Sequence, residues 1–304
     1  MRKFLKYCIL FVLPIFIFMV GLEVLLHSIP NSYKYKYDYV RTKGESIKAV
    51  AVGHSQFYDD FKSEDFYLPA FNLSNSAQGY MEDYYVLKEL LPYMPNLEMV
   101  LLPIGYMTVG REEEFTQKSC FYHEYMNVDY DGKLPLQYRF ECLSVRSSIK
   151  KILLYYLKHD DVVRCDSLGW SPQSVSKREK PLGESNVIDT YTILPDASMF
   201  LAGESYLINI LDLLEQNNIT AVLVSAPYYW TGYEKKNNKQ EKWAINYIQN
   251  LCKERPHLIW INMESDPMFI ESDFFDESHL TVEGAEKFTK KLSEEICKSI
   301  QQAQ

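Results

Sequence analysis

The hydrophobic positions form one long N-terminal run, followed by short apolar runs that alternate with helical patterns. Continuous apolar runs predict buried strands at residues 47–52, 98–104, 220–225 and 258–262. Apolar residues at helical spacing predict helices over residues 81–91, 205–216, 240–252 and 281–300. Short buried strands that alternate with helices are typical of a parallel sheet covered on both faces. We therefore expect an α/β fold with a three-layer, doubly wound parallel sheet.

Residues 106–200 interrupt this alternation and predict an insertion in the middle of the domain. Within the insertion, residues 145–157 have a helical pattern, and residues 122–138 are expected to form a hairpin that turns at Asp131-Gly132. Residues 47–304 are therefore predicted to be one domain with an insertion at about 106–200.

The N-terminal apolar run extends from Tyr7 to Leu26 and follows Arg2, Lys3 and Lys6. Twenty helical residues span roughly 30 Å, which matches the hydrocarbon thickness of a bilayer. No cleavage site of small residues follows the run, so residues 1–28 are predicted to be an uncleaved signal anchor; a cleaved signal peptide is the alternative. The preceding bases favour a cytoplasmic N-terminus and an extracytoplasmic body.

Bases also follow the apolar run and weaken the preference for a cytoplasmic N-terminus; they are Lys34, Lys36, Arg41 and Lys43. Glu23 lies near the outer end of the run, where its carboxylate either reaches the interface or contacts a membrane partner. Residues 29–46 are polar and rich in tyrosine, and we interpret them as a linker that leaves the membrane.

Charge and cysteine content narrow the class of protein. Without residues 1–28 the chain keeps 29 Lys and Arg against 40 Asp and Glu, and this net charge of −11 disfavours nucleic acid as a partner. The six cysteines show no C-x-x-C spacing and no metal pattern, and we expect neither a cofactor nor a metal. In an oxidising compartment one or two disulfides are possible.

Two segments at opposite ends of the domain carry candidate chemistry. Ser55 follows the first predicted strand, and Asp276 and His279 precede the last predicted helix. Ligands of open α/β sheets bind at the carboxyl ends of the strands, where these residues can meet as a Ser-His-Asp triad. Taken singly, Ser55 could be a helix N-cap, His279 a hydrogen-bonded loop residue and Asp276 a cap.

Two further expectations concern the chemistry of this site. A general base must be neutral to accept a proton, so activity is expected to fall as the pH drops through about 6.5, the ordinary pKa of a histidine such as His279. Asp59 and Asp60 are interpreted as charges near a helix start and not as a catalytic pair.

These segments resemble the conserved blocks of the SGNH, or GDSL-type, hydrolase superfamily. Gly53-His54-Ser55 resembles the nucleophile block, with His54 where many members carry Asp. Asp276-x-x-His279-Leu280 resembles the last block. The resemblance implies a flavodoxin-like fold and catalysis by Ser55, His279 and Asp276.

The resemblance also implies an oxyanion hole. Residues 71–79 are similar to the second block, whose glycine lends a backbone N–H, and this role maps to Gly79 beside the N–H of Ser55. The alternative for Gly79 is a turn that needs positive φ. The third block, with its oxyanion asparagine, is not evident, and Asn75 is a weaker candidate for that role. Loss of one oxyanion donor can cost about 10²–10³ in rate.

Within the superfamily, the anchor, the missing asparagine and the insertion resemble exported accessory proteins of cell-envelope polysaccharide O-acylation. This implies an extracytoplasmic serine esterase or acyltransferase whose partners are an envelope glycan or acyl donor and a membrane-bound O-acyltransferase. The alternative is a catalytically inactive scaffold that docks to that acyltransferase or to a polysaccharide export complex. A lipase or peptidoglycan esterase acting alone is a third interpretation.

Overall fold

The computed structural model describes residues 1–106, 108–109, 113–160, 163–171, 181–182, 201–230, 234, 236 and 238–303. The chain divides into two compact units. The N-terminal unit comprises Met1–Tyr39 and Glu114–Arg164, and the sheet unit comprises Val40–Glu113 and Cys165–Gln304.

The sheet unit contains a five-stranded sheet in the order β2-β1-β3-β4-β5. All its pairings are parallel, with Val50 of β1 opposite Phe71 of β2 and Val100 of β3. The strand order reverses at β1, so that the chain crosses the sheet in both directions, as in doubly wound folds. The predicted α/β fold with a parallel sheet is confirmed. The strands are β1 (Ala49–Ala51), β2 (Ala70–Asn72), β3 (Met99–Pro103), β4 (Thr220–Ser225) and β5 (Ile259–Asn262).

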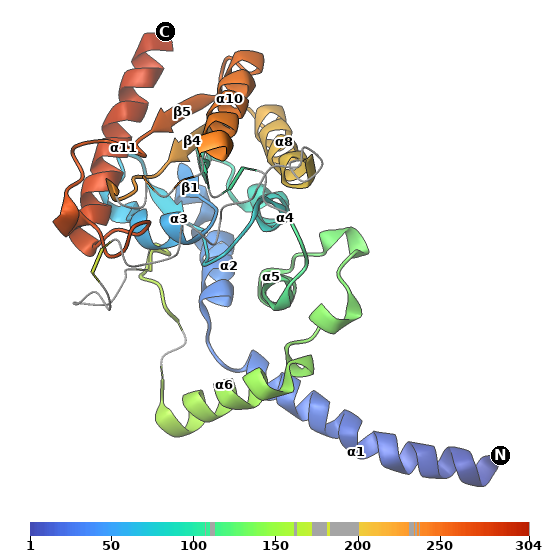
Figure 1. The fold of residues 1–304 in the computed structure, drawn as a ribbon. Helices are drawn as coiled ribbons and strands as arrows, with labels where there is room; N and C mark the ends of the chain where they lie inside the picture. Colours follow the sequence, from blue (N-terminus) through green and yellow to red (C-terminus); the bar gives the residue numbers. More distant parts are fainter. Residues whose placement is uncertain are drawn as a thin grey trace. The chain divides into compact units, whose positions relative to one another are not determined.

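Helices cover both faces of this sheet (Figure 1). On one face, α3 (Ser55–Asp60) packs against α11 (Val282–Ala303). On the other face lie α4 (Tyr80–Leu90), α8 (Leu201–Gln216) and α10 (Asn238–Glu254), with α4 against α8. The predicted helices at 81–91, 205–216, 240–252 and 281–300 are therefore present with small changes of boundary.

The core on the α3 and α11 face holds the elements that carry the candidate site. Phe57 of α3, Phe61 directly after it and Phe288 of α11 are fully buried and form one apolar cluster with the inward side chains of the strands. Burying an aromatic or aliphatic side chain of this size contributes about 1.5–3 kcal/mol. This packing fixes α3 against the N-terminal part of α11.

The sequence did not predict strand β2. It is only three residues long, and its last residue, Asn72, is polar yet completely buried. The Asn72 amide donates hydrogen bonds to the backbone oxygens of Phe57, at 2.7 Å, and Phe61, at 3.0 Å. The buried amide thus completes α3, a role that hydrophobic periodicity does not detect.

The N-terminal unit begins with α1 (Arg2–His27) and the start of α2 (Ser32–Lys43). It also contains α5 (Gln117–Met126), three short 3-10 turns and α6 (Val145–Lys158). Residues Lys3–His27 form one helix that is long and apolar enough to cross a membrane, by length and composition. The predicted helix at 145–157 corresponds to α6.

One prediction for the N-terminal part was wrong. The hairpin over residues 122–138 was wrong, because α5 covers its beginning, capped by Thr116 at one end and by left-handed Asn127 at the other. The Asp131-Gly132 pair lies in a 3-10 turn. Residues 29–46, expected to be a linker, contain α2, in which Lys36 and Val40 are fully buried one turn apart.

The Glu23 carboxylate has partners inside the N-terminal unit. The sequence had suggested only that it reaches the membrane interface or contacts a membrane partner. Its carboxylate accepts the backbone N–H of Cys142 at 2.8 Å and lies 3.5 Å from the His27 ring. His27 in turn forms a 2.5 Å hydrogen bond with Glu124 of α5. Hydrogen bonds thus connect the C-terminal end of α1 to Cys142 and to Glu124 of α5.

Candidate active site

The loop after β1 places Ser55 at the carboxyl edge of the sheet. Gly53 has a φ of +115°, and a Cβ there would lie 2.3 Å from the Pro103 side chain, so the turn has room only for glycine. His54 then caps α3, with its Nδ1 accepting the N–H of Gln56 at 3.4 Å. Ser55 is consequently the first residue of α3, and it is half-buried.

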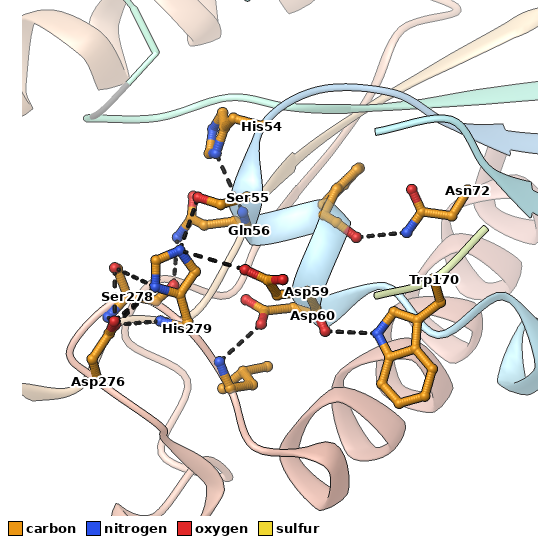
Figure 2. Close-up of polar contacts among 12 residues, drawn as sticks. His54, Ser55, Gln56, Asp59, Asp60, Asn72, Trp170, Asp276, Ser278 and His279 are labelled. Carbon is orange, nitrogen blue, oxygen red and sulfur yellow. Dashed lines mark hydrogen bonds and ion pairs between the residues drawn. The ribbon is translucent and has the colours of Figure 1, made fainter. Parts of the chain in front are cut away.

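Ser55, His279 and Asp276 form one chain of hydrogen bonds (Figure 2). Nε2 of His279 lies 2.8 Å from Oγ of Ser55. Nδ1 of the same ring lies 2.9 and 3.0 Å from the two carboxylate oxygens of Asp276. Because a carboxylate only accepts, it keeps the proton on Nδ1 and leaves Nε2 to accept from the serine hydroxyl.

The loop that carries His279 is folded around the Asp276 carboxylate. Asp276 Oδ1 accepts the backbone N–H groups of Ser278, at 2.7 Å, and His279, at 2.9 Å. Phe274 and Leu280 form an antiparallel bridge that closes the loop before α11. Asp276 is therefore both a cap of this turn and the hydrogen-bond partner of the imidazole.

The ionisation of the pair follows from these contacts. Burial alone would lower the pKa of His279, but the hydrogen bond and charge of Asp276, with the charges of Asp60 and Asp59, raise that pKa to about 9. Burial alone would raise the pKa of Asp276, but its hydrogen bond to His279 outweighs burial and lowers it. The pH below which activity is expected to fall is therefore higher than the 6.5 of an ordinary histidine.

Asp59 and Asp60 lie at the end of α3, beside the imidazole, and not at a helix start as expected. Oδ2 of Asp59 is 4.0 Å from Nε2 of His279. Oδ1 of Asp60 accepts the N–H of Leu280 at 2.8 Å, and burial raises the pKa of Asp60 well above its ordinary value. Spacing could have indicated Asp59, since residues four apart share a helix face and Ser55 lies four residues earlier.

The two predicted oxyanion donors, the backbone N–H groups of Ser55 and Gly79, differ in their hydrogen bonding. The N–H of Ser55 belongs to the first turn of α3, where amides have no acceptor within the helix. The N–H of Gly79, the N-cap of α4, donates to Glu82 at 3.3 Å, and the next amide, Tyr80, donates to Glu113 at 2.9 Å. The first amides of α4 are therefore already bound to carboxylates.

Gly79 does not have the positive φ that the turn interpretation requires, since its φ is −109°. A Cβ at this position would lie 2.3 Å from a carboxylate oxygen at the flexible end of the Glu113 side chain, so a larger residue would require that side chain to move. A small pocket lies here, lined by residues that include His54, Gly79, Thr108 and Glu113. One of its lining residues, His54, directly precedes Ser55 in the sequence.

Asn75 is held within its own loop. Its side chain is buried, and its amide donates to the Leu73 backbone oxygen at 3.4 Å and to the Gln78 side chain at 3.0 Å. Gln78 in turn donates to Asp83 at 2.5 Å. Both amide hydrogens of Asn75 thus have acceptors in this loop, and the structure does not bring them to Ser55.

One group of side chains among the described residues could hold a metal ion by distance. The ligand atoms of Glu23, His27 and Glu124 all lie within 4.8 Å of one another. The group belongs to the N-terminal unit and contains no residue of the Ser-His-Asp chain. Its hydrogen bonds within the chain account for its arrangement without an ion.

Comparison with known proteins gives little. No protein-family model and no curated protein matches the chain. A solved structure described as "The structure of a putative platelet activating factor from Streptococcus pneumonia" matches with a TM-score of 0.42 and 11% sequence identity. The alignment covers 94% of this chain and 97% of that one. A similarity this distant says nothing about activity.

Proposed function

We propose that this protein is a serine acyl-hydrolase or acyltransferase of the SGNH type. The observation that carries the proposal is the hydrogen-bonded chain from Ser55 Oγ through His279 to Asp276. A serine hydroxyl becomes a useful nucleophile when a positioned base takes its proton, and the base needs a third group to fix its tautomer. The described residues supply all three.

The reaction would proceed in two halves. Ser55 Oγ attacks the carbonyl carbon of an ester or thioester while Nε2 of His279 takes the hydroxyl proton. The tetrahedral intermediate collapses, the imidazolium protonates the leaving oxygen or sulfur, and an acyl-serine remains. Water or an acceptor hydroxyl then attacks the acyl-serine, giving its proton to His279, and Ser55 Oγ leaves and recovers that proton. Asp276 stabilises the imidazolium in both halves.

The oxyanion would be held by the N–H of Ser55 together with Gly79. The Gly79 amide can serve only when the Glu82 carboxylate, now 3.3 Å away, releases it. Its bond to Glu82 is longer than the common 2.9–3.0 Å, so exchange for a developing oxyanion is reasonable. Catalytic hydrogen bonds often tighten only in the complex with substrate.

We further propose an extracytoplasmic acyl ester of a cell-envelope glycan as substrate, with α1 as the membrane anchor. The proposal rests on the resemblance to accessory proteins of polysaccharide O-acylation and on the apolar length of α1. A membrane-bound O-acyltransferase would be the partner that supplies or consumes the acyl group. The negative charge of the chain argues against nucleic acid.

Turnover of an aryl acetate by the full chain in detergent tests the activity. We expect hydrolysis that Ser55→Ala reduces by at least about 10³-fold, since removing the nucleophile removes covalent catalysis. Adding a glycan acceptor should divert acetyl groups to the glycan if the enzyme is a transferase. Equal turnover by wild type and Ser55→Ala would contradict the proposed activity.

A second candidate is a non-catalytic scaffold that docks to a membrane acyltransferase or an export complex. It is favoured by the occupied amides of Gly79 and Tyr80 and by the engaged side chain of Asn75. In that case the full chain would co-purify with its membrane partner, and Ser55→Ala would support acylation in cells as well as wild type does.

A further inference from the structure

We infer that Asp59 is a positioning residue that acts on the Nε2 side of His279, opposite Asp276, and that Asp60 fixes the backbone of the same histidine. The inference rests on the proposed function, because it concerns how the base of that site is held and charged. It adds an acidic pair on α3 to the predicted Ser-His-Asp arrangement.

Asp59 faces the atom that changes its protonation during the proposed reaction. Its Oδ2 lies 4.0 Å from Nε2 of His279, the nitrogen that also contacts Ser55 Oγ at 2.8 Å (Figure 2). The Asp59 side chain is only 8% exposed, so water screens its charge weakly. Once Nε2 has accepted the serine proton, the imidazolium lies between two carboxylates, with Asp276 at Nδ1 and Asp59 at Nε2.

The backbone that carries Asp59 is held in place. The indole N–H of Trp170 donates to the Asp59 backbone oxygen at 2.7 Å, in a buried contact. Asn72 ties the preceding turn of α3 through the Phe57 oxygen. A carboxylate on a fixed backbone can keep its distance from the ring, which is what a positioning role requires.

Asp60 acts on the position of His279. Its Oδ1 accepts the N–H of Leu280 at 2.8 Å, directly after the histidine, and the whole side chain is buried. Its other oxygen, Oδ2, has no hydrogen-bond partner among the described residues. Gln56 adds a second link, from its amide to the Ser278 backbone oxygen at 3.3 Å. These bonds join α3, which carries the nucleophile, to the loop that carries the base.

Other charged groups lie on the elements around this junction. On the histidine loop, Asp276 is the direct partner, and Glu277 is buried. On α11, Lys287 pairs with Asp273 at 2.6 Å. After α3, Lys62 pairs with Asp65 at 2.8 Å. In the described part of the chain, the groups that raise the pKa of the His279 ring are thus Asp276, Asp60 and Asp59.

Two functional consequences follow. Asp59 stabilises the imidazolium intermediate, which increases the rate of proton transfer from Ser55. The same charge keeps His279 protonated in the resting enzyme at pH values where an ordinary histidine is neutral. Replacing Asp59 by the neutral isostere should therefore shift the titration of His279 to lower pH while slowing the reaction of the neutral form.

The test measures the titration of His279 and the activity on the same samples of full chain in detergent. ¹³C-histidine NMR follows the ring resonances, with His279→Gln to assign the signal, in wild type, Asp59→Asn and Glu98→Gln. Glu98 is a half-exposed acid that pairs with Lys48 just before β3, at the opposite edge of the sheet from Ser55. It is the matched removal of one negative charge. The pH profile of kcat/KM for ester turnover is recorded alongside.

We expect Asp59→Asn to lower the pH midpoint of His279 by about one unit, as loss of a nearby opposite charge does. The acid limb of kcat/KM should move by the same amount, and the plateau rate should fall about tenfold, the factor equivalent to one unit. Glu98→Gln should move neither. An unchanged midpoint in Asp59→Asn would overturn the inference, even if the rate fell.

Asp60→Asn is the second variant. Its amide oxygen can still accept the Leu280 N–H although the charge is lost, so we expect Asp60→Asn to keep more activity than Asp60→Ala, which loses the anchor as well. Equal activity of the two Asp60 variants would overturn the anchoring role. If the wild-type chain hydrolyses no ester, the proposed function fails, but the NMR midpoint still decides the role of Asp59.

Discussion

At the residue scale, the site is built from side chains that each do two things. Asp276 caps the turn before α11 and also binds the His279 ring. His54 caps α3 and also lines the pocket beside Ser55. Because the same atoms fold the loop and hold the base, substitutions here should affect the pH dependence of the reaction as well as its rate.

The pH profile of ester turnover is a prediction at this scale. Neutral His279 is the form that accepts the serine proton, and its pKa is raised to about 9 in the folded protein. Activity should therefore rise with pH through a midpoint well above 6.5. Asp276→Asn removes the largest of the contacts that raise the pKa, so the midpoint should fall and kcat should drop about 10²–10⁴-fold, because the tautomer is no longer fixed.

The contradicting result is a wild-type acid limb at or below 6.5, or an Asp276→Asn profile with an unchanged midpoint. Asp276→Asn must keep the far-ultraviolet circular dichroism of wild type for the comparison to count, since the carboxylate also caps the turn.

At the element scale, the short helix α3 depends on its neighbours. Six residues are too few for a stable isolated helix, so α3 persists through the packing of Phe57 and Phe61 against α11. Phe288 of α11 is fully buried, with its ring centroid 6.4 Å from that of Phe57. This contact joins the element that carries Ser55 to the helix that follows His279.

Phe288→Ala is the corresponding prediction. Removing a buried phenyl group should lower the free energy of unfolding by about 3–5 kcal/mol, which corresponds to a fall of about 10 °C in Tm. Val282→Ala, at the 39% exposed first residue of α11, is the control and should change Tm by no more than a few degrees. Thermal unfolding of the full chain in detergent measures both. Equal shifts in the two variants would contradict the account of this core.

The elements also show what the sequence could predict. Runs such as Thr220–Ser225 are long, apolar and β-branched, and the structure has β4 over the same residues. Strand β2 escaped because its polar Asn72 is buried by hydrogen bonds rather than by hydrophobicity. The hairpin prediction at 122–138 rested on the Asp131-Gly132 turn signal and was wrong, because residues up to Met126 belong to α5, whose Tyr122 and Met126 are buried one turn apart.

At the scale of the whole molecule, the candidate site joins residues 224 positions apart in the chain, Ser55 and His279. The sequence could predict their meeting, because a residue after β1 and a loop before the last helix both lie at the carboxyl edge of a parallel sheet. Asp60 was not predicted to act there, since its contact to the Leu280 N–H depends on how α3 packs beside the loop. Nor could spacing show that the Asn75 amide is engaged locally.

Covalent labelling can identify the nucleophile of this site, which we propose is Ser55. The full chain in detergent is treated with a fluorophosphonate probe at pH 9, and the labelled peptide is identified by mass spectrometry. Ser278 is the matched control, because its hydroxyl also lies beside the imidazole, 3.2 Å from Nδ1, on the side held by Asp276.

We expect wild type and Ser278→Ala to be labelled on Ser55 and Ser55→Ala not to be labelled. Labelling should also weaken as the pH is lowered through the midpoint of His279. Labelling of Ser278, or equal labelling of wild type and Ser55→Ala, would contradict the assignment of the nucleophile. Absence of labelling in every variant would contradict the catalytic role of the site and favour the scaffold.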